Sequence, residues 1–436
     1  MSRNDEIKAI LDATGFKVHV NLQRLLYLLI VAGIVVFIVG LVGNQPHLAW
    51  QALLVNTMFF SGLALGGLML SVIFTITSAV WGRPIKRLAE AMTVFLPVGV
   101  VLFIILFFGA EQIFQWTDPQ KVIHAKAGWL NFPFFVIRNS FLLGLMAILT
   151  WFYIKSTLRP DIGLAKKLGD LKSVLTEKLT INYLSQQSEE IRFQRRTKVM
   201  APPLALVFAV LCTLLAFDWM MSIDQEWFST MFGVQYAVSN LLGAAAALLI
   251  ISGIARRRFK LEEYITIARY HDLAKLTFAA CALWTYMIFS QVLVIWYANL
   301  PEETPYLILR MQSLEWSWMF WLIMALLFII PFFGLMSRTA CNSIWFSRII
   351  AMEILIGIWL EKYFLIVPSV QENNAISSLK SGQEGLVGFV FNFYDMFITL
   401  AVLSVFVLSY LWLLQRVPVV PISDELLCKA DFESSE

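Results

Sequence analysis

Charged residues are scarce in this sequence. Asp, Glu, Lys and Arg make up 14% of its 436 residues, against about 25% in a typical soluble domain. Hydrophobic residues make up 59%, and the mean hydropathy is +0.73. This composition excludes a soluble globular protein, and a formal net charge of +3 gives no strongly basic surface for nucleic acid. We therefore predict an all-α, polytopic membrane protein.

Cysteine and histidine are also rare, with four of each. The cysteines are far apart and form no CxxC pair, which excludes the usual patterns of iron–sulfur and zinc sites, so we expect buried small side chains. No histidine falls near the middle of an apolar run, so paired haem ligands are excluded. Walker, dinucleotide-binding and HExxH motifs are absent. We expect a chain that carries no haem, iron–sulfur cluster or metal of its own. The residues are Cys212, Cys281, Cys341 and Cys428, and His19, His47, His124 and His271.

Ten apolar runs are long enough to span a bilayer, which takes about 20 residues per helix. No small-residue cleavage site follows the first run, so we expect a retained helix and not a signal peptide. Pro97 and Pro331 fall inside runs and are expected to kink them. The predicted spans are 25–43, 50–80, 91–115, 131–154, 201–217, 229–253, 273–298, 314–336, 344–366 and 385–414.

Lysine and arginine are distributed unevenly between the segments that join these spans. One side of the membrane receives 27 of the 33, the other side five, and Arg138 lies within a span. Cytoplasmic loops carry the excess of cations, so both termini are predicted to be cytoplasmic. The five on the other side are Lys121, Lys126, Arg310, Lys362 and Lys380.

The one long segment between spans is 156–199, on the predicted cytoplasmic side. Its apolar residues have helical spacing, which favours an amphipathic helix on the membrane surface. A docking surface for a partner subunit is the alternative. The spaced residues are Leu164, Leu168, Leu171, Leu175 and Leu179.

An internal repeat relates the two halves of the chain. Arg87-Leu88-Ala89-Glu90 begins the third span, and Asp272-Leu273-Ala274-Lys275 begins the seventh. An offset of four helices keeps the direction, so we predict two parallel four-helix units, spans 2–5 and 6–9, flanked by spans 1 and 10. The outer stretch 217–233 would join the units. The predicted parts are 1–48 (N-terminus and first span), 49–221 (first unit), 222–366 (second unit) and 367–436 (last span and tail).

Four polar residues are predicted to meet at the outer ends of spans 3, 4 and 5: Glu111, Gln112, Arg138 and Asp218. A quinol site needs an apolar slot and a proton acceptor near each hydroxyl, and aromatic residues are plentiful in this region. These four residues are therefore candidates for a quinone pocket. The alternative is an ion pair between Arg138 and a carboxylate that closes the helix bundle.

Ionisable groups within a membrane are costly, so each one suggests a function. Glu353 and Asp395 are predicted near mid-depth, in spans 9 and 10, either as a proton-relay pair or as acids bonded to neighbouring helices. Other polar residues would extend a proton path, although polar helix packing gives a similar pattern. The proton-path candidates are Glu90, His271, Asp272, Lys275, Tyr286, Gln291, Glu353 and Asp395.

Three stretches resemble a known family. They are FDWMMSIDQEWFSTMFG at 217–233, HDLAKLTFAA at 271–280 and FSQVLVIWYANLPEE at 289–303. They are similar to the ActF-type quinone-binding subunits of alternative complex III, in the NrfD or polysulfide-reductase-like integral membrane family. The resemblance implies two four-helix bundles with flanking helices, a bacterial inner membrane, menaquinol oxidation with cytochrome c or another high-potential acceptor, and a proposed role in proton translocation. The implied partners are a sister NrfD-type subunit, an iron–sulfur protein, haem c subunits, small membrane subunits, a terminal oxidase and phospholipid.

Three functions compete at this point. The first is a cofactor-free subunit that contributes a quinone pocket or a proton path to respiratory electron transport. The second is a structural anchor without quinol chemistry. The third is a secondary transporter, which the parallel repeat disfavours because transporter repeats are often inverted and have broken helices at mid-membrane.

Overall fold

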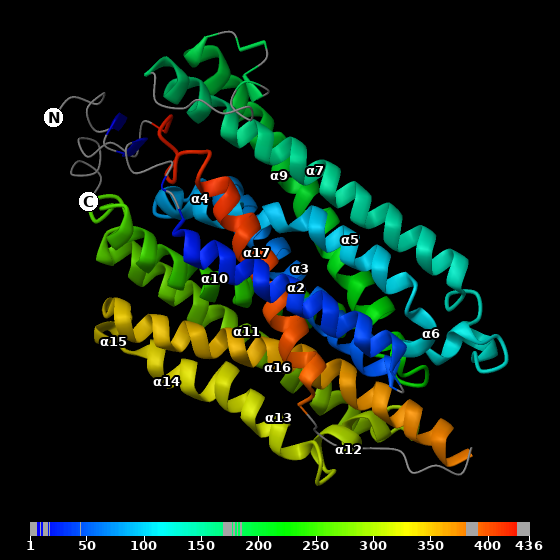
Figure 1. Cartoon of the computed structure of the whole chain (residues 1–436). Helices are drawn as coiled ribbons and strands as arrows, with labels where there is room; N and C mark the ends of the chain where they lie inside the picture. The colour runs from blue at the N-terminus through cyan, green and yellow to red at the C-terminus, as the bar shows by residue number, and fades with distance from the viewer. Residues whose placement is uncertain are drawn as a thin grey trace.

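The computed structural model of the chain describes residues 7–8, 10–11, 16, 18–43, 45–168, 177, 179–180, 182–183, 185–380 and 391–424. Within these ranges the chain forms helices and turns and no strand. Long helices lie side by side in one elongated bundle (Figure 1). The prediction of an all-α, polytopic membrane protein is confirmed.

Eight long helices and two interrupted ones make up the bundle. The long helices are α2 (Val20–Val42), α3 (Pro46–Ile76), α7 (Phe132–Lys167), α9 (Gln186–Trp219), α10 (Phe232–Arg258), α11 (Ile267–Ala298), α16 (Ile344–Lys380) and α17 (Phe393–Leu414). The interrupted ones are α4 (Arg83–Met92), η1 (Thr93–Phe95) and α5 (Leu96–Phe107), then α13 (Ser317–Met324), η5 (Ala325–Ile329) and α14 (Ile330–Met336). Short elements are α6 (Ala110–Ile113), η2 (Gln115–Thr117), η3 (His124–Lys126), η4 (Met221–Ile223), α12 (Thr304–Met311) and α15 (Arg338–Asn342).

Nine of the described helices, taken with their breaks, are long and apolar enough to cross a membrane. The helix α16 is not among these nine and has four charged residues among its first nineteen. The number of ten spans therefore stays a prediction. The four charged residues are Arg348, Glu353, Glu361 and Lys362.

The helices α3 and α10 form the centre of the bundle. In their most apolar windows, 78% and 72% of the residues are buried, against 22% for α2 at the periphery. Small residues allow this close approach: a Cβ added at Gly66 would lie 2.1 Å from the main-chain oxygen of Asn240. The Tyr236 hydroxyl donates to the carbonyl of Met58 at 3.0 Å. These two helices are equivalent in the predicted repeat, whose division into two units stays a prediction.

The two prolines that are expected to kink their spans lie at breaks in a helix. The 3₁₀ turn η1 precedes Pro97, which is the second residue of α5, and the π-helical segment η5 precedes Pro331, the second residue of α14. A proline ring removes one backbone donor and clashes with the preceding turn. The predicted kinks are therefore local changes of helix type.

The long segment 156–199 differs from the prediction. Its described ends continue two membrane helices, since α7 extends to Lys167 and α9 begins at Gln186. The prediction of a separate surface helix is thus wrong for these described parts. Leu171 and Leu175 lie outside the described residues. Hydropathy failed here because a helix can continue beyond the bilayer when its exposed face becomes polar.

The end of the sequence also needs two corrections. The helix α17 begins at Phe393 and not at about 385, because Asn392 and Asp395 form a reciprocal cap. The helix α16 continues far beyond residue 366, so Lys362, counted above as an outer cation, is a fully buried residue of a helix. The outer side then keeps four cations, which strengthens the charge asymmetry.

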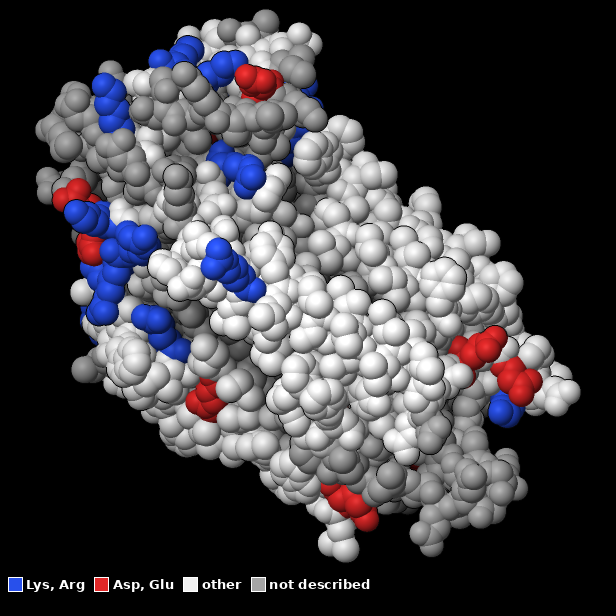
Figure 2. All heavy atoms as spheres, in the orientation of Figure 1, with Lys and Arg blue, Asp and Glu red and all other residues white. Residues whose placement is uncertain are grey.

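Charged side chains gather at the two ends of the bundle (Figure 2). In the view shown, Lys and Arg crowd the end where α10 finishes with Arg256, Arg257 and Arg258, while carboxylates are prominent at the other end. The long middle of this face is uncharged, as expected for a surface in contact with lipid. This pattern agrees with the positive-inside argument. The cytoplasmic location of the termini remains a prediction.

The contact between α3 and α10 gives the first testable expectation. Gly66→Ala should destabilise the protein by about 1–3 kcal/mol, the usual cost of overpacking, because its Cβ would meet the Asn240 carbonyl. Gly144→Ala is the matched control, since a Cβ at Gly144 meets nothing within 4 Å. Thermal unfolding of the detergent-solubilised protein measures both. Equal unfolding temperatures for the two variants would contradict the tight crossing.

Candidate functional site

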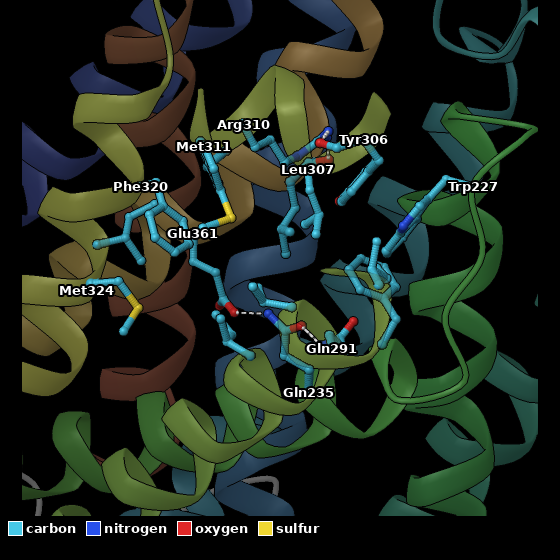
Figure 3. Close-up of a pocket in the computed structure, with 17 residues that line it drawn as sticks. Trp227, Gln235, Gln291, Tyr306, Leu307, Arg310, Met311, Phe320, Met324 and Glu361 are labelled. Carbon is cyan, nitrogen blue, oxygen red and sulfur yellow. Dashed lines mark hydrogen bonds between the residues drawn. The ribbon is translucent and has the colours of Figure 1, made fainter. Parts of the chain in front are cut away.

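A cavity of about 60 Å³ lies at the predicted outer end of the second predicted unit (Figure 3). It is lined by the helices α10, α11, α12, α13 and α16 and by the loop that contains Trp227. Most of its wall is apolar, with a few polar side chains at two places. The polar and aromatic lining residues are Trp227, Phe232, Gln235, Gln291, Tyr306, Arg310, Phe320, Glu361 and Phe364.

Glu361 is the centre of the polar side of this cavity. Its Oε1 accepts hydrogen bonds from Gln235 Nε2 at 3.1 Å and from Trp284 Nε1 at 2.8 Å. Its Oε2 accepts from the Ser239 hydroxyl and from Lys362 Nζ, the latter at 2.8 Å. A buried carboxylate is costly unless it is paired and hydrogen-bonded. This one has both an ammonium partner and neutral donors.

Two amides extend the network from Glu361 toward the outer loop. Gln291 Nε2 donates to Gln235 Oε1 at 2.6 Å, and the Ser229 hydroxyl donates to Gln291 Oε1 at 3.0 Å. Figure 3 shows Gln235 between Glu361 and Gln291 on one side of the cavity. A continuous line of hydrogen bonds therefore connects the buried carboxylate to the outer loop.

Arg310, Tyr306 and Trp227 form the opposite side (Figure 3). The Trp227 and Tyr306 rings stack with centroids 3.7 Å apart, and the Arg310 guanidinium lies 3.5 Å from the Tyr306 centroid. Arg310 Nη2 donates to Ser369 Oγ at 2.8 Å. Burial raises the pKa of Tyr306 to about 12, so its hydroxyl stays protonated at neutral pH. Burial also lowers the pKa of Arg310 from its usual value.

Two N–H donors beside the cavity have no acceptor among the described residues. They are the indole Nε1 of Trp227 and the Nε of Arg310, and both residues are 2% exposed. A buried donor without a partner is rare and calls for an explanation. Both side chains line the cavity, so an oxygen-bearing molecule inside it is the acceptor that this arrangement suits.

The predicted quinone-pocket residues are arranged differently. Asp218 accepts two bonds from Arg138, both at 2.7 Å, one from Asn139 at 2.6 Å and one from Trp129 at 3.1 Å. A carboxylate has about four acceptor positions, so Asp218 is saturated. Glu111 is exposed, as is Gln112. The structure thus brings Arg138 and Asp218 together and leaves the other two apart, and a role for these residues at a quinone stays a prediction.

Aromatic rings fill the space behind this ion pair. The buried indole of Trp219 donates to Asn139 Oδ1 at 2.9 Å, and four phenyl rings surround it. Aromatic rings therefore occupy the space around Trp219 beside the ion pair. The phenyl centroids lie 4.9–6.0 Å from that of Trp219 and belong to Phe103, Phe107, Phe114 and Phe135.

A second polar network lies at the predicted cytoplasmic end and includes Glu90. Lys86 Nζ donates to Thr75 Oγ1 at 2.7 Å, and that hydroxyl lies 2.7 Å from the Tyr153 hydroxyl. The Ser71 hydroxyl lies 3.1 Å from Tyr153 and donates to Glu90 Oε1 at 3.0 Å. A cavity of about 560 Å³ is lined by Thr75, Lys86 and Glu90 among others.

An ion cluster holds Glu90 in place. Arg87 pairs with both Glu90 and Asp161, and the side chains of all three are only about 1% exposed. Asp161 also accepts the main-chain N–H of Ser423 at 2.9 Å. Buried charges in such a cluster need partners. Three helices and the C-terminal segment supply them for the two carboxylates and for both terminal nitrogens of Arg87, while the Nε of Arg87 has no partner among the described residues.

The equivalent end of the second unit has a looser arrangement. Asp272 and Lys275 form a solvent-exposed pair at 3.8 Å, worth little in water. His271 is 8% exposed, and its Nδ1 has no partner among the described residues. Tyr286 is 59% exposed, so its side chain points away from the interior of the helix bundle.

Glu353 and Asp395 lie at different distances from the starts of their helices. Glu353 is nine residues after the start of α16, roughly 14 Å along its axis at 1.5 Å per residue, and its Oε1 has no described partner. Asp395 is in the first turn of α17 and accepts the Asn392 N–H at 3.0 Å. Asp395 therefore lies two residues after the start of its helix, instead of about ten as predicted, and its depth in the membrane stays a prediction. The role of either acid in a proton path remains a prediction.

Sequence reasoning selected Gln291 but missed the residues around it. Glu361 and Lys362 are adjacent charges inside an apolar run, and that signal was available from the rule that intramembrane charges suggest function. Ending the span at 366 made them look like outer residues. Gln235 and Arg310 gave no comparable signal, because a cavity depends on how helices from distant parts of the chain pack.

Comparison with known proteins adds one match. The family model described as "Polysulphide reductase, NrfD" matches residues 40–372, which include every residue of both networks except those of the C-terminal segment. No curated protein shows significant similarity to the chain.

A substitution in the Arg138–Asp218 pair can test whether Asp218 stabilises the fold or acts at a quinone. Asp218→Asn should cost about 3–5 kcal/mol of stability, because it leaves a buried guanidinium without its counter-charge. Asp118→Asn removes an exposed acid from a surface pair with Lys121 and should cost at most about 1 kcal/mol. Thermal unfolding checks both values. Unchanged stability with lost quinol turnover in Asp218→Asn would instead assign this acid to a quinone site.

Proposed function

Because the chain belongs to the polysulphide reductase NrfD family, we propose that its outer cavity binds the headgroup of a quinol and that Glu361 accepts a proton from it. The observation that carries the proposal is the cavity itself. It places a buried carboxylate opposite two N–H donors that have no described acceptor. A quinol offers hydroxyl oxygens at both ends of an apolar ring, which is the shape and polarity that this wall would fit.

The chain is an integral membrane, quinone-interacting subunit of an oxidoreductase complex. Our finer proposal is a menaquinol-oxidising complex of the alternative complex III type, with cytochrome c or another high-potential acceptor. The partners would be a sister NrfD-type subunit, an iron–sulfur protein, haem c subunits, small membrane subunits and a terminal oxidase. The resemblance of the three stretches described above supports this assignment.

The proposed chemistry follows from the residues on the two sides of the cavity. Oxidation of a quinol releases two electrons and two protons. The Trp227 and Arg310 donors would hold one ring oxygen. The carboxylate of Glu361 has four donors, so a neutral one such as Gln235 would have to turn away before Glu361 takes a proton from the hydroxyl opposite. The second proton would leave the other ring oxygen to water. Lys362 stabilises the ionised carboxylate and so keeps it ready to accept. The electrons would pass to a redox cofactor in a partner subunit, and the protons would leave toward the outer side.

The size of the cavity sets a condition on this proposal. Pockets for drug-sized ligands measure about 300–1,000 Å³, whereas this one holds about 60 Å³. A ring therefore enters only if lining side chains move. Met311 and Met324 lie on the wall beside Phe320 (Figure 3), and methionine side chains are unbranched and change rotamer readily.

The cytoplasmic network is the proposed start of a proton path. Lys86, Thr75, Tyr153, Ser71 and Glu90 form an unbroken series of hydrogen bonds that begins in a polar cavity. Hydroxyl groups both donate and accept, which proton transfer along such a series requires. The support is geometric: exchangeable groups follow one another at hydrogen-bond distance along one wall of this cavity, which Glu90 also lines.

Glu361→Gln tests the quinol proposal. We expect kcat/KM for menaquinol oxidation by the assembled complex to fall about 100-fold, since loss of a general base commonly costs 10²–10⁴-fold. Glu315→Gln is the control, because Glu315 is an exposed outer acid that does not line the cavity. Spectroscopic reduction of the acceptor measures the rate. Normal turnover in both variants would favour the structural-anchor alternative.

Glu361→Gln leaves Lys362 without its counter-charge and could unfold the protein. A second, milder variant therefore tests the same site. Trp227→Phe keeps an aromatic ring beside Tyr306 and removes only the N–H donor. We expect it to raise KM for menaquinol several-fold with little change in kcat, because the donor holds the ring oxygen throughout the reaction. An unchanged KM would remove Trp227 from the site.

Tyr153→Phe tests the proton path. It removes the hydroxyl that bridges Thr75 and Ser71, so proton uptake per electron in vesicles with the assembled complex should fall by at least half. Uncoupled quinol oxidation should stay near normal. Tyr410→Phe is the matched control, since its buried hydroxyl donates only to the carbonyl of Leu88. A pH-sensitive dye records the ratio, and equal ratios for both variants would rule out this route.

A further inference from the structure

We propose that α9 carries a binding site for the headgroup of an anionic phospholipid, formed by Arg192, Arg195 and Arg196. These arginines belong neither to the outer cavity nor to the cytoplasmic hydrogen-bond series. A groove of about 390 Å³ is lined by them and by Val199 and Met200. The site stands independently of the proposed quinol chemistry.

The arginines lie where a membrane helix leaves the bilayer. Residues three, four and seven apart share one face of a helix, so Arg192, Arg195, Arg196 and Val199 form one stripe. Going toward the membrane, this face continues with apolar side chains that nothing in the described chain covers. Val199 and Leu206 are each 68% exposed, and Val210 is 49% exposed. Cationic groups thus lie directly above an exposed apolar track.

Two of the three arginines of this stripe have no counter-charge within the described residues. Glu189 is buried and accepts from Arg159 Nε at 3.1 Å and from Arg192 Nη1 at 3.3 Å, which fixes Arg192 at one end of the stripe. Arg195 and Arg196 are exposed, and no described acid lies within ion-pair distance of either. Their planar guanidinium groups can hold a phosphate through two parallel N–H···O bonds.

Two prolines add hydrogen-bond acceptors at the same level. Pro202 and Pro203 lie inside α9 and have no N–H to donate to the carbonyls of Lys198 and Val199, four residues earlier. Those carbonyls are left to accept from another donor. A lipid headgroup that carries both a phosphate and hydroxyl groups, such as phosphatidylglycerol, would satisfy the guanidinium donors and these carbonyls together.

The apolar track decides between a lipid and a soluble anion. A free phosphate would use only the arginines, whereas a phospholipid would also cover Val199, Leu206 and Val210 with an acyl chain. Burial of exposed apolar surface and pairing of charge then act on one ligand. An acidic segment of a partner subunit would use the arginines but would not depend on lipid.

The test uses the delipidated full-length protein in a neutral detergent. Phosphatidylglycerol is titrated in, with thermal unfolding and native mass spectrometry as readouts, and phosphatidylcholine and inorganic phosphate as the other additions. Phosphatidylglycerol alone should raise the unfolding temperature. Arg195→Gln combined with Arg196→Gln should weaken its apparent affinity roughly 30-fold, because each interfacial cation contributes on the order of a fivefold gain.

The control removes the same charge elsewhere at the same end of the molecule. Arg257 and Arg258 are exposed at the end of α10, and changing both to Gln should leave the affinity for phosphatidylglycerol unchanged. Equal unfolding temperatures of the lipid-free variants and the native protein would show that folding is intact. Equal stabilisation by phosphatidylcholine, an effect of free phosphate as large as that of the lipid, or equal losses in both double variants would each overturn the proposal.

Discussion

The close crossing of α3 and α10 is the contact on which the rest of the structure depends. Gly66 lets the main chain of α10 approach at Asn240, and Gly62 leaves room for the Asn240 side chain, so no larger residue fits at either position without displacement. In a membrane, helices associate through such packing and through hydrogen bonds, since lipid is as apolar as their side chains. The helices α9 and α16 each contact both central helices. The two polar networks are therefore built on one rigid pair.

The treatment of buried polar groups distinguishes the two halves. At the outer end of the first half, Asp218 has four donors and Trp219 is enclosed by rings. At the outer end of the second half, Glu361 is equally well bonded, but Trp227 and Arg310 retain donors with no described acceptor. A satisfied network stabilises a fold, and an incomplete one marks a place for a ligand. The first half also holds buried polar groups with no described partner, the side-chain amide of Gln51 among them. The second half is the better candidate for binding because its two unpartnered donors line a cavity.

The sequence was sufficient for properties that depend on composition along the chain. The apolar runs predicted the nine described helices that are long and apolar enough to span a membrane. Pro97 and Pro331 marked positions where a helix is interrupted. Cys212, Cys281 and Cys341 are buried free thiols as expected, while Cys428 lies outside the described residues. The family resemblance agrees with the match over residues 40–372.

Helix ends that are set by caps, and contacts that are set by packing, could not be predicted from the hydropathy of the sequence. The start of α17 is set by the bond between Asn392 and Asp395, which hydropathy does not register. Lys362 was placed outside the bundle because hydropathy treats a lysine as polar, although burial beside Glu361 and Ser239 satisfies it. The outer cavity forms only where five helices between residues 232 and 380 meet. Only the three-dimensional structure shows that Gln291 belongs to it and Glu111 does not.

The placement of the two networks bears on how they would act together. The Glu90 series uses α3, α4 and α7, and the Glu361 network uses α10, α11 and α16. Within the described residues no series of hydrogen bonds joins one to the other. Coupling between quinol oxidation and proton movement would then require water or a shift of helices. The π-helical segment η5 is suited to such a shift, since its Leu327 packs on Gly357, one turn from Glu361 on the same helix, and π-helical turns occur often at functional sites.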